Sequence, residues 1–95
     1  MQALLVKPGH APEVITLDSN GEKAFVKIRD LVGGYLERVR IEGLDVYCDE
    51  DGNMKRLPPN RHGLVGTFVV LGPGPMWMVG LNETELLRAM DLFQL

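Results

Sequence analysis

The feature that most constrains the fold is a predicted β-hairpin in the middle of the chain. Tyr35–Ile41 and Leu44–Cys48 both have strand character, and only Glu42 and Gly43 separate them. A two-residue connection with glycine at a position of positive φ is typical of a tight hairpin turn. Strands joined by so short a turn run antiparallel, so the chain is expected to contain an antiparallel sheet.

Other segments add strands to this hairpin. Ala3–Val6 is a short apolar run that ends at turn residues, and Glu13–Leu17 alternates and should pair antiparallel with it. Val65–Leu71 is the most strand-like stretch of the chain and is expected to lie centrally in the sheet. Met76–Val79, after a Gly-Pro turn, is a candidate for a further short strand.

The first predicted helix follows Ser19, which forms a capping-box pattern with Glu22 three residues later. The helix should end at Gly33 and Gly34, because glycine adopts the left-handed conformation at little cost. Its expected inner face consists of Ala24, Phe25, Ile28, Leu31 and Val32.

The last predicted helix opens at Asn82, with Glu85 completing a second cap signature. Its expected inner face consists of Leu86, Leu87, Met90 and Phe93. The resulting order is β-β-α-β-β-β-β-α. We therefore predict an α+β domain with a mainly antiparallel sheet of five to six strands and two helices packed on it.

Length and composition indicate one soluble domain over residues 1–95. The hydrophobic content of 45% suits a globular chain, and the net charge of -3 argues against a dedicated nucleic-acid binder. A single cysteine is typical of the reducing cytoplasm. No apolar run approaches the ~20 residues that span a bilayer, so no membrane partner is expected.

Several chemistries lack the residues they need. Cys48 has acidic neighbours in Asp49 and Glu50, which raise a thiol's pKa and make it less reactive. His10, His62 and Cys48 show no short metal-ligand spacing. We therefore expect no catalytic residue, no metal and no cofactor.

One group of polar residues is a candidate binding site. Glu37 is in register with apolar residues of its strand, so we expect a buried or half-buried carboxylate. A rigid pair of prolines precedes Asn60 and Arg61, and Glu37 is expected to hydrogen-bond to this segment. With Tyr35 and Lys7, these residues suit recognition of a small polar ligand or of a partner protein.

The chain resembles a known family in several short motifs, and the opening MQALLVKPG resembles that family's first strand. The motifs are Leu31–Glu37, Asp49–Gly52, Leu57–Arg61 and Val65–Thr67, and they resemble the domain-of-unknown-function 3846 family. Members are small proteins found largely in bacteriophages, prophages and bacteria. The family often has Asn where Asp49 stands. The resemblance implies a phage-related or bacterial accessory protein in the cytosol and implies no enzyme activity.

Two classes of function follow as expectations. The first is a non-catalytic binding module, phage- or prophage-related, that acts on a host protein or a small ligand. The alternative is a protein that sequesters a nucleotide or signalling ligand, or a small enzyme, using the region of Glu37, Asn60 and Arg61. Self-association into a homo-oligomer is expected in either case, because unpaired sheet edges and apolar residues such as Trp77 and Met78 favour a two-fold contact.

Overall fold

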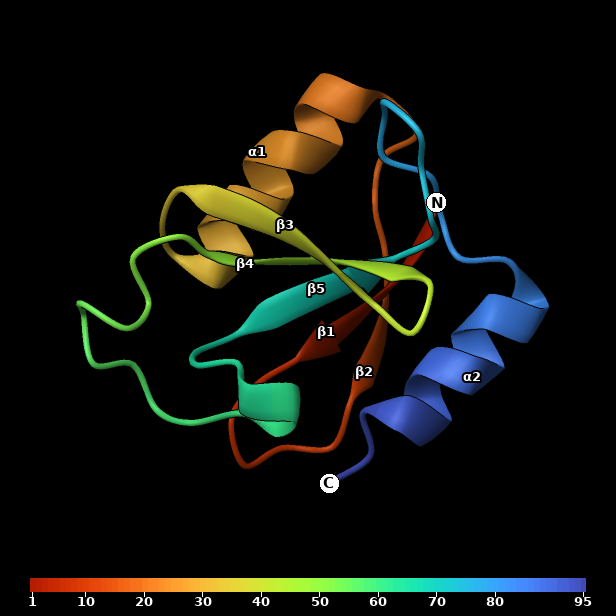
Figure 1. Cartoon of the computed structure of the whole chain (residues 1–95). Helices are drawn as coiled ribbons and strands as arrows, with labels where there is room; N and C mark the ends of the chain where they lie inside the picture. The colour runs from red at the N-terminus through yellow and green to blue at the C-terminus, as the bar shows by residue number, and fades with distance from the viewer.

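The computed structural model describes residues 1–95 and contains one five-stranded sheet with two α-helices (Figure 1). The elements are β1 (Gln2–Val6), β2 (Glu13–Thr16), α1 (Gly21–Val32), β3 (Leu36–Ile41), β4 (Leu44–Asp49), a 3₁₀ turn at Arg61–Gly63, β5 (Phe68–Leu71) and α2 (Glu83–Leu92). The strand order is β2-β1-β5-β4-β3, and every neighbouring pair is antiparallel. The predicted α+β fold is confirmed, with β5 at the centre of the sheet as expected.

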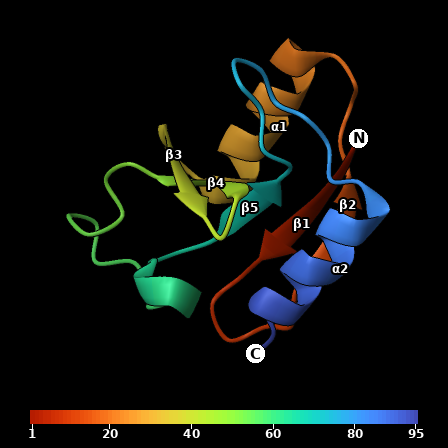
Figure 2. The same ribbon diagram turned by 45° about the vertical axis from the view of Figure 1, so that its right-hand side comes forward.

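The two helices cover opposite faces of the sheet, which lies between them in Figure 2. The alternation of β1 shows why. Ala3 and Leu5 pack with α1, whereas Leu4 and Val6 pack with α2, and all four are buried. Because successive side chains of a strand point to opposite faces, a continuous apolar run suits a strand that is covered on both sides.

The start of α1 differs from the prediction by one residue. Asn20 is the N-cap, and its side chain accepts a hydrogen bond from the Lys23 backbone N–H at 3.1 Å. The expected box of Ser19 and Glu22 is therefore wrong. Gly33 ends the helix in the left-handed region with φ 91°, as predicted.

Gly34 is needed for a different reason. A Cβ at this position would lie only 2.6 Å from both Asp49 Oδ2 and Lys55 Nζ, which form an ion pair at 2.7 Å. Gly33 is thus required for its left-handed backbone conformation, and Gly34 is required because a side chain at its position would meet the ion pair. Only the first of these roles follows from helix-ending rules.

The capping box of α2 is confirmed, with Asn82 accepting from the Glu85 N–H at 2.8 Å and Glu85 accepting from the Asn82 N–H at 3.0 Å. Its inner face is centred on Ala89 and Phe93, both fully buried. Leu87 and Met90 were expected on that face but are 64% and 39% exposed. Each residue rotates an α-helix by about 100°, so a buried face centred on residues 89 and 93 places Leu87 on the opposite side of the helix and Met90 at its flank.

The segment after β5 forms little regular structure. The strand expected at Met76–Val79 consists of a single antiparallel bridge between Gly72 and Val79. Neither helix of the structure has the length and apolar character needed to cross a membrane.

Candidate functional site

The structure brings together three of the five residues predicted as a binding site. Asn60 lies where the chain returns toward β1, and its Nδ2 donates to the carbonyls of Val6 at 3.1 Å and Gly66 at 2.7 Å. Its Oδ1 accepts from the Arg61 backbone N–H at 2.8 Å and from Arg61 Nη1 at 3.0 Å. All of these partners belong to the chain itself.

Arg61 is used in the same way. Its Nη1 donates to the Lys7 carbonyl at 2.8 Å, and its Nη2 donates to the His10 carbonyl. Its Nε is buried without a hydrogen-bond partner. The guanidinium therefore holds the loop between β1 and β2 against the segment that precedes β5. Lys7 contributes a backbone carbonyl here, and its side chain is exposed.

The side chains of Tyr35 and Glu37 form no hydrogen bond with this group, although Glu37 lines a small cleft together with Gly63 and Leu64. Tyr35 precedes β3 and is 65% exposed, with the Arg29 guanidinium 4.9 Å from its ring centre. Glu37 is exposed, and its side chain makes no hydrogen bond or ion pair, so the expected burial is wrong. The reason is position: β3 is an edge strand, and its end near Glu37 is not covered by a helix.

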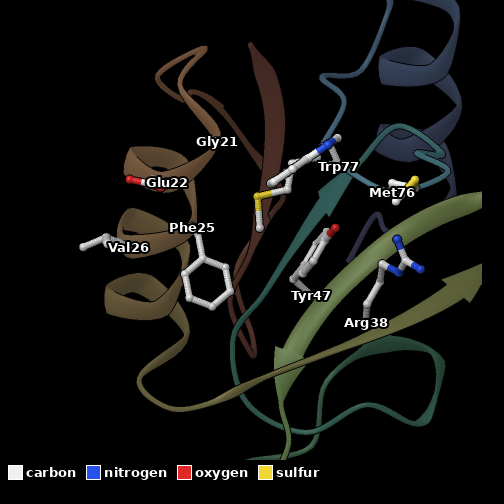
Figure 3. A pocket seen from close by; sticks show the side chains of 9 residues that line it. Gly21, Glu22, Phe25, Val26, Arg38, Tyr47, Met76 and Trp77 are labelled. Atoms are coloured by element: carbon white, nitrogen blue, oxygen red, sulfur yellow. The ribbon is translucent and has the colours of Figure 1, made fainter.

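A groove elsewhere on the molecule has the composition of a binding site. It is a cavity of about 540 Å³ between α1 and the segment 76–78, above the sheet (Figure 3). Its principal lining side chains are Phe25 and Val26 of α1, Arg38 and Tyr47 of the sheet, and Met76, Trp77 and Met78. Met76 and Trp77 are 83% and 74% exposed. Phe25 was expected on the inner face of α1, but it is 42% exposed beside this groove.

The arrangement of side chains in the groove is seen in Figure 3. Phe25 and Tyr47 face the space between helix and sheet, whereas Glu22 and Val26 line the groove at its outer border, with their side chains turned to the outer side of α1. A Cβ on Gly21 would lie 3.8 Å from Trp77 Cε3, so the indole ring approaches the first residue of the helix. Trp77 thereby spans from its own loop to α1.

A buried carboxylate positions this loop. Asp45 is 1% exposed and accepts hydrogen bonds from the Gly74 N–H at 3.0 Å and from Arg40 Nε at 2.9 Å. Arg38 Nη1 lies 3.8 Å from the same carboxylate. The Gly74 carbonyl accepts from Arg38 at 3.5 Å and from Arg40 at 3.3 Å. These contacts join the start of the 74–78 loop to the β3–β4 hairpin.

The cluster of Arg38, Arg40 and Asp45 at the sheet side of the groove has an excess of positive charge, whereas Glu22 lines the groove at α1. Two guanidiniums share one carboxylate, and the side chains of Arg38 and Arg40 remain 44% and 54% exposed. Arg38 is directly opposite Tyr47 in the strand register. Burial raises the pKa of the Tyr47 phenol, and a hydrogen bond with Arg38 opposes that shift. The phenol is therefore protonated at neutral pH and can donate a hydrogen bond.

Cys48 and Asp49 lie at the other end of the hairpin. Burial, and then the charges of Glu37 and Asp49, raise the pKa of the Cys48 thiol, which donates to the Glu37 carbonyl at 3.6 Å. Burial alone would raise the pKa of Asp49, but hydrogen bonds from Lys55 and from the Asp51 N–H lower it. A thiol with a raised pKa is a weak nucleophile. No group of three or more His, Cys, Asp or Glu side chains is placed to hold a metal ion.

Comparison with known proteins identifies the family. A model of the family described as Domain of unknown function (DUF3846) matches residues 1–94. The chain belongs to this family. No curated protein and no solved structure matches it.

The sequence analysis predicted neither the groove nor the contact between Arg40 and Asp45 beside it. In this DUF3846 protein, the Glu42-Gly43 turn sets the hairpin register, which places Arg40 opposite Asp45. That contact could have been read from the sequence by counting outward from the turn. The place of Phe25 could not, because it depends on how α1 rotates against the sheet.

Proposed function

We propose that the protein is a non-catalytic binding module that holds an apolar part of its target in the groove between α1 and residues 76–78. The observation that carries this proposal is the cavity of about 540 Å³ with exposed Trp77 and Phe25 at its sides. Small-molecule sites typically have volumes of roughly 300–1,000 Å³ and mostly apolar linings with a few polar groups.

The construction of the groove also favours binding. Asp45 holds Gly74 in place, and a Cβ at Gly74 would overlap the Trp77 carbonyl oxygen, so the loop turns tightly before the indole. A wall that is already ordered loses less conformational entropy when a ligand arrives. Met76 adds an unbranched, adaptable side chain that can fit ligands of different shape.

The polar groups of the groove support binding rather than turnover. The Arg38 guanidinium and the Tyr47 phenol, whose pKa is raised by burial, both act as hydrogen-bond donors. General base catalysis needs a proton acceptor within reach of the ligand. Glu22, the carboxylate that borders the groove, points away from it in Figure 3.

The setting we propose is the cytoplasm, in a phage- or prophage-related accessory role, and it rests on the family resemblance. The target is a host protein or a small ligand. The alternative, a sequestering protein or enzyme that uses Glu37, Asn60 and Arg61, has less support. The Asn60 amide and both terminal nitrogens of Arg61 donate to groups of the chain itself, and the Glu37 side chain forms no hydrogen bond with either residue.

Trp77 is the single tryptophan, so its fluorescence reports directly on the groove. Titration with octan-1-ol, a neutral apolar probe, should shift its emission in a saturable way. Phe25→Ser should weaken binding roughly tenfold, because one aromatic contact surface is removed. Leu87→Ser, on the opposite side of the sheet, is the matched control and should bind like the wild type.

Two results would contradict the proposal. One is an emission spectrum that no concentration of octan-1-ol changes, and the other is equal binding by Phe25→Ser and the wild type. A separate incubation with a panel of nucleotides tests the absence of catalysis. Conversion of any of them would favour the enzyme alternative.

A further inference from the structure

The charges beside the groove point to the class of its ligand. Arg38 and Arg40 carry two positive charges, and Asp45 is the one carboxylate paired with them. The cluster therefore has one uncompensated positive charge, in a chain whose net charge is -3. Asp45 is 1% exposed, whereas the side chains of Arg38 and Arg40 are about half exposed. The excess positive charge is therefore accessible to a ligand from the solvent.

The position of Arg38 connects this charge to the apolar groove. Arg38 lines the cavity together with Phe25 and Trp77, and its strand neighbour Tyr47 lies at the floor. In Figure 3 the Arg38 guanidinium and the Tyr47 hydroxyl lie on the side of the groove nearer Met76, across from Phe25. The groove thus has an apolar wall at the helix and two hydrogen-bond donors at the sheet.

We propose that the ligand is a small amphipathic molecule with a single anionic head group, a carboxylate or a phosphate. This inference rests on the proposed function of the groove. The head group would bind at Arg38, with Tyr47 as a second donor, and the apolar body would lie between Phe25 and Trp77. The negative charge of either head group is complementary to the uncompensated positive charge of the cluster, and charge-assisted hydrogen bonds are stronger than neutral ones.

Four probes with the same eight-carbon chain test the head group. Octanoate and monooctyl phosphate are anionic, octan-1-ol is neutral, and octylammonium is cationic. We expect at least one anionic probe to bind roughly tenfold or more tightly than octan-1-ol, the gain typical of a hydrogen bond to a charged group. Octylammonium should bind more weakly than octan-1-ol. The tighter of the two anions identifies a carboxylate or a phosphate as the natural head group.

Variants then assign the preference to one residue. Arg38→Gln should remove most of the difference in affinity between the anion and octan-1-ol. The fold should persist in this variant, because Asp45 keeps its contacts with Arg40 and with the Gly74 N–H. Arg38→Lys, which keeps the charge, should retain part of the preference. Arg88→Gln removes the same charge from exposed α2 and should behave like the wild type.

The outcomes separate this inference from the proposed function. Equal binding of anionic and neutral probes, or equal binding of octylammonium and octanoate, overturns the anionic ligand but leaves the apolar groove as a binding site. An anion preference that survives in Arg38→Gln also overturns it. Failure of every probe to change Trp77 emission or to shift amide resonances of α1 contradicts both proposals.

Discussion

At the scale of single residues, several polar side chains of this protein, partly or fully buried, hold its own backbone. Asn60 and Arg61 satisfy the carbonyls of Val6, Lys7 and His10, and Asp45 holds the Gly74 N–H. Backbone groups removed from water need partners, and irregular segments cannot supply them through a strand ladder. Amide and guanidinium side chains with several donors are suited to this role.

Arg61→Ala is expected to lower the free energy of unfolding by roughly 1–3 kcal/mol, because it leaves the Lys7 and His10 carbonyls without their donor. Arg61→Lys should recover only part of this loss, since an ammonium cannot reproduce the planar fork of a guanidinium. Urea denaturation measures both changes.

An unchanged denaturation midpoint for Arg61→Ala would show that these hydrogen bonds are not stabilising. Arg61 would then again be a candidate for binding a ligand. A role of Arg61 in binding a target, as the sequence predicted, would require a free guanidinium. In the structure, both terminal nitrogens of the side chain are occupied.

At the scale of elements, the helix ends show how local rules and tertiary contacts combine. Gly33 and Asn82 act through their own backbone and the adjacent turn, and both were predicted correctly. Gly34 acts by leaving space for the ion pair of Asp49 and Lys55, which lie at the end of β4 and in the loop that follows it. Local signals therefore predict where a helix ends better than they predict what packs against its end.

The capping box predicts the stability of one variant. Asn82→Ala should cost about 1 kcal/mol of unfolding free energy, because the Glu85 N–H loses its acceptor. Asn53→Ala, in an exposed turn where the side chain makes no hydrogen bond, is the matched control and should change little. Denaturation midpoints that coincide for the two variants would show that the cap is not stabilising.

At the scale of the whole molecule, β2 and β3 are the two open edges of the sheet. Pairing of β3 with a second copy is unfavourable, because opposed residues of an antiparallel pair share a face. A two-fold pairing centred on Arg38 would oppose that residue to itself, and one centred on Val39 would oppose Arg38 to Arg40. A centre at Glu37 would oppose two carboxylates. The charges of β3 therefore protect this edge.

Self-association is instead expected at the exposed Trp77, one of the apolar residues predicted to favour a two-fold contact. We expect sedimentation velocity at micromolar concentrations to show a reversible dimer that weakens in Trp77→Ser. Leu95→Ser is the control, because Leu95 is 77% exposed and lies outside the groove lining. A monomer at every concentration would contradict the prediction.

The sequence by itself determined the elements of this protein. A two-residue turn specified an antiparallel hairpin, apolar runs specified the buried strands, and Asn82 with Glu85 specified the start of the last helix. These features depend on residues close together in the chain, where backbone sterics and local hydrogen bonds dominate. The central position of β5 also followed, since its apolar residues require cover on both faces.

Only the tertiary structure decided which side chains are available to a ligand. Glu37 shares a strand face with apolar residues, yet it is exposed because β3 is the edge strand. Phe25 was placed in the core, yet it borders the groove because Ala24, Ile28 and Val32 set the rotation of α1. Burial depends on which elements pack over a given face. That outcome is set by contacts between distant segments, which no local pattern encodes.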